Sequence, residues 1–91
     1  MQVLGQAVRN GQLLYSDHAN SRMRERGIIK PEIERVLNCG HHEARKDQFN
    51  EEFDAWDYAI KGKTLDGRNL RIVIAVVDPK VLVVTAIDLD A

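Results

Sequence analysis

The chain has 91 residues, of which 44% are hydrophobic and 30% are charged, and its formal net charge is −1. This composition is that of one small globular domain with a single modest core, and it lacks the overall basic charge of a typical nucleic-acid-binding protein. No apolar run approaches the roughly 20 residues of a membrane span, and the N-terminus does not have the pattern of a signal peptide. With only one cysteine, Cys39, the chain cannot form an internal disulfide. We therefore expect a cytoplasmic protein that does not contact membranes.

Charge is distributed unevenly along the chain. Residues 1–46 carry eight Lys/Arg and five Asp/Glu, whereas residues 47–57 carry five acidic residues and no basic one. The simplest interpretation of the acidic segment is a solvated polar loop. The average charge can nevertheless conceal a local basic site in the rest of the chain.

Helices are predicted in the first forty residues. Apolar residues at helical spacing indicate a first helix over residues 2–10, and residues 12–15 follow as a connector or short strand. Ser16 is a favourable N-cap and Gly27 a favourable helix end, so a second helix is predicted over residues 17–26. A third helix begins near Pro31, which suits a first helical turn, and ends at Gly40. The predicted helical half of the protein therefore covers about residues 1–40.

After residue 40 the hydrophobic pattern changes from helical spacing to strands. The expected strands cover residues 41–46, 55–62, 70–77 and 81–87, and they are separated by a loop over 47–54, a hairpin turn at Asp66-Gly67 and a turn at 78–80. The uninterrupted apolar run of residues 70–77 predicts the central strand. These elements predict a single α+β domain, residues 1–91, in which two or three N-terminal helices pack on a four-stranded antiparallel sheet over about residues 41–88.

The hairpin turn allows a prediction of the two sheet faces. A two-residue loop at Asp66-Gly67 places Tyr58 opposite Ala75, and it places Tyr58 and Arg71 on the same, more open face. On that face Arg71 can also form a cross-strand ion pair with Asp88. The bulkier face is predicted to pack against the helices; its members are Ile72, Ile74, Val76, Val83, Thr85 and Ile87. A slip of one residue would exchange the two faces.

The second predicted helix carries three polar residues along one side. At about 100° per residue, His18, Arg22 and Arg26 lie within about 80° of one another, next to Ala19 and Met23. An imidazole and two guanidiniums therefore border the stripe that should face the rest of the protein. The structural alternative is that Arg26 complements the helix dipole and Arg22 lies over apolar surface.

The residues of this helix carry a resemblance to a known family. The pattern Tyr15-Ser16-x-His18-Ala19-x-x-Arg22-Met23-x-x-Arg26-Gly27-Ile28 resembles the bacterial domain of unknown function 4258 family. The following helix and two late strands match as well, in Pro31-Glu32-Ile33-Glu34-Arg35-Val36-Leu37-x-x-Gly40, Gly67-Arg68-x-Leu70-Arg71-Ile72-Val73-Ile74 and Val83-Val84-Thr85-Ala86. The resemblance implies a fold similar to RelE-like toxins and, for some members, activity as a toxin–antitoxin ribonuclease. Two positions depart from it, because Arg71 stands where members often have histidine and Ile87 where they often have an aromatic residue.

Metal-independent RNA cleavage needs a base for the attacking 2′-hydroxyl, an acid for the leaving oxygen and positive charge at the phosphorane. We predict that His18 is the titrating group, that Arg22 and Arg71 bind the phosphate, and that Tyr58 acts as an acid or stacks on a base. Four further residues are predicted to contact RNA: Arg26, Lys61, Lys63 and Arg68. No metal or other cofactor is expected. The stretch from Cys39 to His42 contains zinc-ligand residue types, but neighbouring strand residues point to opposite faces and the chain has no Cys-x-x-Cys pair.

Three functions are compatible with these residues. The leading hypothesis is a toxin-like ribonuclease (similar to an mRNA interferase), or a decayed relative, with RNA as substrate and a small antitoxin protein as partner. The alternative is a non-catalytic module that binds RNA or protein on the same surface. A third is a dimerising domain that uses the edge of residues 81–87.

Overall fold

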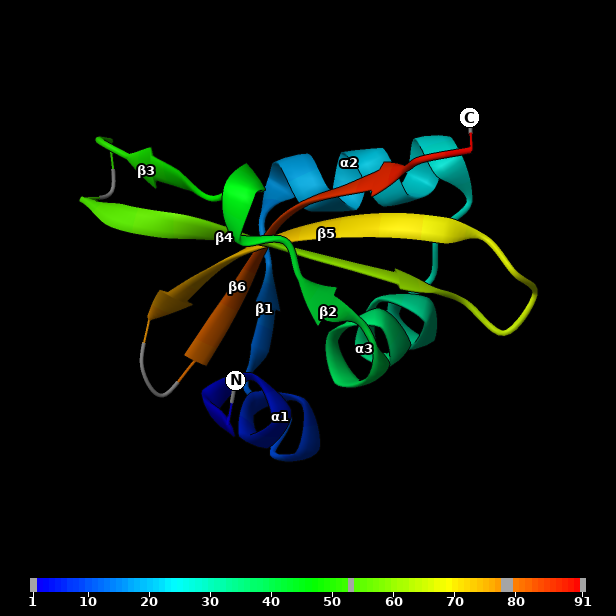
Figure 1. Ribbon diagram of the computed structural model, residues 1–91, viewed down its shortest axis with the longest axis horizontal. Coiled ribbons are helices and arrows are strands. Elements are labelled where there is room, and N and C mark those ends of the chain that lie inside the picture. Colours follow the sequence, from blue (N-terminus) through cyan, green and yellow to red (C-terminus); the bar gives the residue numbers. More distant parts are fainter. Residues whose placement is uncertain (1, 53, 78–79, 91) are drawn as a thin grey trace.

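Three helices and a mixed sheet make up the computed structural model, which describes residues 2–52, 54–77 and 80–90 (Figure 1). The helices are α1 (Gln2–Arg9), α2 (Asp17–Arg26) and α3 (Lys30–Cys39). The strands are β1 (Leu13–Tyr15), β2 (His41–His42), β3 (Gln48–Asn50), β4 (Ala55–Lys63), β5 (Asn69–Val77) and β6 (Lys80–Asp88), with a short 3₁₀ turn, η1 (Ala44–Lys46). The predicted α+β class is therefore confirmed.

The sheet is larger and less regular than predicted. Its order is β1-β6-β5-β4-β2, and β3 also pairs with β4, so the described residues form six strands rather than four. β1 runs parallel to β6, which makes the sheet mixed instead of antiparallel. Backbone hydrogen bonds account for this extra strand, because the amide of Val81 donates to the carbonyl oxygen of Gln12 (3.1 Å) and that of Ser16 to the carbonyl oxygen of Val83 (3.0 Å). The predicted loop at 47–54 contains β3, and the predicted strand at 41–46 divides into β2 and η1.

α2 forms over the range that the sequence predicts. The hydroxyl of Ser16 accepts a hydrogen bond from the amide of Ala19 (3.0 Å) and donates one to the carbonyl oxygen of Val84 (2.8 Å), so a single side chain caps the helix and attaches it to β6. Gly27 ends the helix at a φ of 64°, where its amide donates to the carbonyl oxygen of Met23. The N-terminus of α2 is therefore fixed beside β6.

The core lies between the helices and one face of the sheet. β5 is the central strand, between β4 and β6, as predicted. Among the largest fully buried side chains are Ile33, Val36, Leu70, Ile72, Ile74, Val81 and Val83. They join residues of all three helices in one hydrophobic cluster. The prediction that Ile72, Ile74 and Val83 face the helices is therefore correct.

The predicted pairing of β4 with β5 is wrong by one residue. Tyr58 lies opposite Ile74 instead of Ala75, because the turn has a three-residue loop between Thr64 and Arg68. Gly67, at a φ of 84°, is the last loop residue, and its left-handed backbone provides the extra position. Strand alternation then places Tyr58 and Arg71 on opposite faces of the sheet.

The pairing of β5 with β6 changes register between Val73 and Ile74, so Thr85 and Ile87 face away from the main core, contrary to prediction. The predicted turn at 78–80 lies partly outside the described residues. β1 pairs with β6 only as far as Val83. The C-terminal half of β6 therefore extends past β1, and it is there that α2 packs beside the strand (Figure 1).

Candidate functional site

A groove between α2 and the end of β6 contains the three polar residues of the predicted helix face. His18, Arg22 and Arg26 line it together with Thr85, Ala86, Ile87 and Asp88 of β6, around a volume of about 400 Å³. All three α2 side chains are exposed, whereas Ala19 and Met23, next to them on the helix, are buried in the core. The buried stripe of α2 thus orients the imidazole and both guanidiniums toward the strand.

Positive charge predominates in this α2 groove. Arg22 Nη1 lies 2.9 Å from a carboxylate oxygen of Glu25, but this pair is exposed and on the same helix. Asp88 has a lowered pKa, because it accepts a hydrogen bond from the backbone amide of Asp90 and another from Arg68. Its charge is therefore compensated from within the protein. The guanidiniums of Arg22 and Arg26 remain accessible to an external anion.

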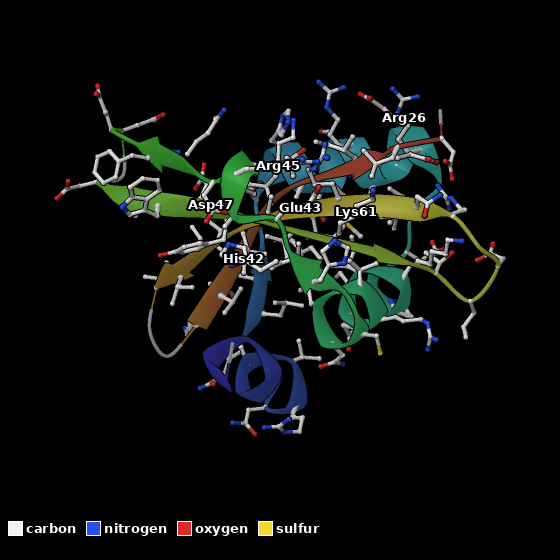
Figure 2. The ribbon with its side chains drawn as sticks, in the orientation of Figure 1. Arg26, His42, Glu43, Arg45, Asp47 and Lys61 are labelled. Carbon is white, nitrogen blue, oxygen red and sulfur yellow. The ribbon has the colours of Figure 1, made fainter. Side chains whose placement is uncertain are left out.

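A second group of cationic side chains, Arg45, Lys61 and Arg71, lies on the face of the sheet away from α1 and α3. Figure 2 shows Arg26, Arg45, Glu43 and Lys61 on this same side of the sheet. Lys61 is the direct neighbour of Arg71 across the sheet, and Arg71 is in turn the neighbour of Ile87, which lines the α2 groove. A row of side chains therefore leads from the groove across the sheet to Lys61.

Arg71 is already bound to a carboxylate. Its Nε lies 2.7 Å and its Nη2 3.3 Å from the two oxygens of Glu43, whose side chain is only 6% exposed. The hydrogen bonds from Arg71, and after them the charges of Arg71, Lys61 and Arg45, lower the pKa of Glu43. Arg71 therefore forms a structural ion pair with Glu43.

The segment between β2 and β3, residues 43–47, contains the short turn η1 and positions Glu43 and Arg45. The amide of Glu43 donates to the carbonyl oxygen of Ala59 (2.8 Å), and the amide of Ala59 donates to the carboxylate of Asp47 (3.1 Å). His42 Nε2 lies 2.8 Å from the same carboxylate. These contacts fix both ends of the segment. The sequence does not point to Glu43 and Arg45, because it predicts a regular strand over this segment.

The other predicted site residues lie elsewhere. Tyr58 packs against the core and makes an edge contact with the His42 ring, with the centroids 5.7 Å apart. Arg68 donates to the carbonyl oxygens of Arg26 (2.7 Å) and Gly27 (3.1 Å), and it binds Asp88 (3.0 Å). Lys63 is exposed at the end of β4. The α2 groove therefore unites His18, Arg22 and Arg26, but neither Tyr58 nor Arg71 lines it.

Comparison with known proteins identifies the family. A family model described as Domain of unknown function (DUF4258) matches residues 15–88. The chain belongs to this family. The DUF4258 match begins just before α2 and ends with β6, so it includes every residue that lines the α2 groove. No curated protein and no solved structure matches the chain.

Within residues 2–52, 54–77 and 80–90, no group of three or more His, Cys, Asp or Glu residues is placed to hold a metal ion. Cys39 is exposed at the end of α3. No helix in the same residues is long and apolar enough to cross a membrane.

Proposed function

We propose that this DUF4258 protein acts on RNA through the α2 groove, as a metal-independent ribonuclease of the toxin–antitoxin type or a decayed relative of one. The observation that supports the proposal is that His18, Arg22 and Arg26 line one accessible groove against the end of β6. Guanidiniums bind phosphate, and an imidazole can move protons at neutral pH. A fold similar to RelE-like toxins also belongs to this proposal.

The proposed chemistry uses only groups of the α2 groove. The imidazole of His18 takes the proton of the RNA 2′-hydroxyl as that oxygen attacks phosphorus, and Arg22 and Arg26 stabilise the charge of the phosphorane. Water supplies the proton to the leaving 5′-oxygen, since Tyr58 and Arg71 do not line the groove. This mechanism has one protein group that transfers protons. The rate should therefore rise through a single ionisation.

The position of Arg71 favours a second candidate function. An enzyme of this kind would benefit from a second catalytic group, yet Arg71 is paired with Glu43 and Tyr58 faces the core. A module that binds RNA phosphates without cleaving them needs only the exposed cations. The two candidates share the same phosphate-binding groove and differ in the role of His18.

The first test measures binding to a single-stranded RNA as a function of salt. Arg22→Ala should weaken binding and lower the slope of log affinity against log salt by about one contact. Arg24→Ala is the matched control, because it removes the same charge from an exposed position on α2 that does not line the groove. Equal effects of the two substitutions, or no binding by the wild type at about 50 mM salt, would contradict the proposal.

The second test separates the enzyme from the binding module. Cleavage of a mixed RNA in the presence of a chelator should fall by roughly 10²–10⁴ in His18→Ala, as is usual when an acid–base group is removed. His41→Ala, which alters another exposed histidine, should leave the rate unchanged. Binding without cleavage in the wild type would favour the module.

A further inference from the structure

A two-stranded ribbon projects from one end of the sheet, where β3 pairs with the beginning of β4 (Figure 1). Phe49 lies directly opposite Trp56 on this ribbon. Their rings meet edge to face, with the centroids 5.6 Å apart and an interplanar angle of 74°. The residues are 46% and 49% exposed, so much of both aromatic surfaces remains in water.

The same ribbon carries a concentrated negative charge. All five charged residues between positions 47 and 57 are acidic. Asp47 and Asp57 accept hydrogen bonds from groups of the protein, whereas Glu51, Glu52 and Asp54 are exposed around the turn at the tip of the ribbon. This charge repels nucleic-acid phosphates. Any RNA bound in the α2 groove is therefore not expected to continue over the ribbon.

The aromatic pair has a structural role, because cross-strand aromatic contacts stabilise a two-stranded ribbon. That role alone does not account for the combination of a half-exposed aromatic pair with exposed carboxylates. Aromatic side chains surrounded by polar groups are typical of the residues that dominate protein–protein binding. The sign of the surrounding charge then determines which partner fits.

We propose that Phe49, Trp56 and the acidic tip form a docking surface for a cationic, partly apolar segment of another protein. Apolar side chains of the partner cover the two rings. Its lysines or arginines pair with Glu51 and Glu52, and a cation also gains by lying over the face of Trp56. This surface does not depend on the function of the α2 groove, since it uses a different end of the molecule and the opposite charge.

The experiment uses a library of short random peptides displayed on phage and selected against the full chain. Selected peptides should combine Lys or Arg with apolar residues. Because Trp56 is the only tryptophan, binding of a synthetic copy should shift the fluorescence of the protein to shorter wavelength, and the affinity should fall with added salt. Phe49→Ala, which keeps the fluorescent residue, should weaken binding by about tenfold or more.

Two further variants complete the test. The double variant Glu51→Gln/Glu52→Gln changes exposed turn residues without altering the core, and it should reduce both the affinity and its dependence on salt. Leu65→Ala, an exposed apolar residue in the β4–β5 turn, should leave binding unchanged. The proposal is overturned if no peptide is selected, if the selected peptides are neutral or acidic, or if Phe49→Ala binds them normally. A fluorescence shift caused by polyuridylate, or by raising the concentration of the protein alone, would identify RNA or a second copy as the occupant and would equally overturn it.

Discussion

Two pairs of arginines in this protein have the same chemistry and opposite surroundings. Arg22 and Arg26 project from α2 into the α2 groove and are exposed. Arg68 and Arg71 are held by carboxylates, and their side chains are only 24% and 20% exposed. From the sequence, all four are predicted to contact RNA. An arginine is therefore available to a ligand only when no carboxylate of the protein already binds its guanidinium.

The distance along the chain explains why the sequence could not separate the two pairs. Glu43 lies 28 positions from Arg71, and Asp88 lies 20 positions from Arg68. Only the assembled sheet and the segment between β2 and β3 bring these charges together. The partner of Arg22, in contrast, is Glu25 on the same helix, where neighbouring charges can be identified from spacing.

The largest effect on stability is expected for Arg71→Met. The carboxylate of Glu43 is nearly buried, and the substitution removes the guanidinium that donates two hydrogen bonds to it. The free energy of unfolding should therefore fall by about 2–3 kcal/mol. Urea denaturation measures the loss. The double variant Arg71→Met/Glu43→Gln should recover part of it, since no unpaired charge remains. A loss below about 0.5 kcal/mol would show that Arg71 is as free to bind a ligand as Arg22.

A smaller loss is expected for Arg68→Lys. The guanidinium of Arg68 reaches two carbonyl oxygens at the end of α2 and the carboxylate of Asp88, and a single ammonium cannot replace this planar arrangement. The free energy of unfolding should fall by about 1–2 kcal/mol, which a thermal melt detects as a lower midpoint. Arg35→Lys changes an exposed arginine of α3 and should not shift the midpoint.

Local signals predicted much of the fold. Ser16 and Gly27 fixed both ends of α2, and the apolar run of residues 70–77 identified the central strand, because capping and burial depend mainly on nearby residues. The turn at Asp66-Gly67 was also predicted at the correct place in the chain. Its loop length was not, since Gly67 closes a three-residue loop instead of occupying the second place of a two-residue one.

That one-residue difference in register changes which predicted residues can join the candidate site. It placed Tyr58 on the core face, away from Arg71 and from His18. Arg71 lies beside Ile87 at the groove, but it does not join His18 because it is paired with Glu43. For a related reason the sequence predicts residues 12–15 only as a connector or short strand, without a place in the sheet: a three-residue strand forms only when β6 supplies its hydrogen bonds. Helical periodicity on α2 required no such long-range information, and it placed His18, Arg22 and Arg26 on the side that lines the groove.

The pH dependence of the free energy of unfolding also distinguishes the paired Arg71 from the exposed arginines. Hydrogen bonds from Arg71 lower the pKa of Glu43 in the folded protein. The Glu43–Arg71 pair therefore stabilises the folded protein fully above the unfolded pKa of a glutamate, about 4.3, and this stabilisation is lost as the pH falls through the lower pKa of folded Glu43. Glu43→Gln should remove this part of the acid-induced decrease in unfolding free energy, whereas Glu51→Gln should retain it. Identical acid profiles for Glu43→Gln and the wild type would contradict the ion pair.

The smallest effect on stability is expected for Arg22→Lys, and it tests the other side of the comparison. The Arg22–Glu25 pair is exposed, and such pairs contribute little, so the free energy of unfolding should change by less than about 0.5 kcal/mol. Lysine keeps the charge, so the salt dependence of RNA binding should stay near the wild-type value, unlike in Arg22→Ala. A lower affinity at unchanged salt dependence would indicate that Arg22 uses two hydrogen bonds on one phosphate. A loss of stability equal to that of Arg68→Lys would instead mean that Arg22 is structural, and the distinction between the two pairs would fail.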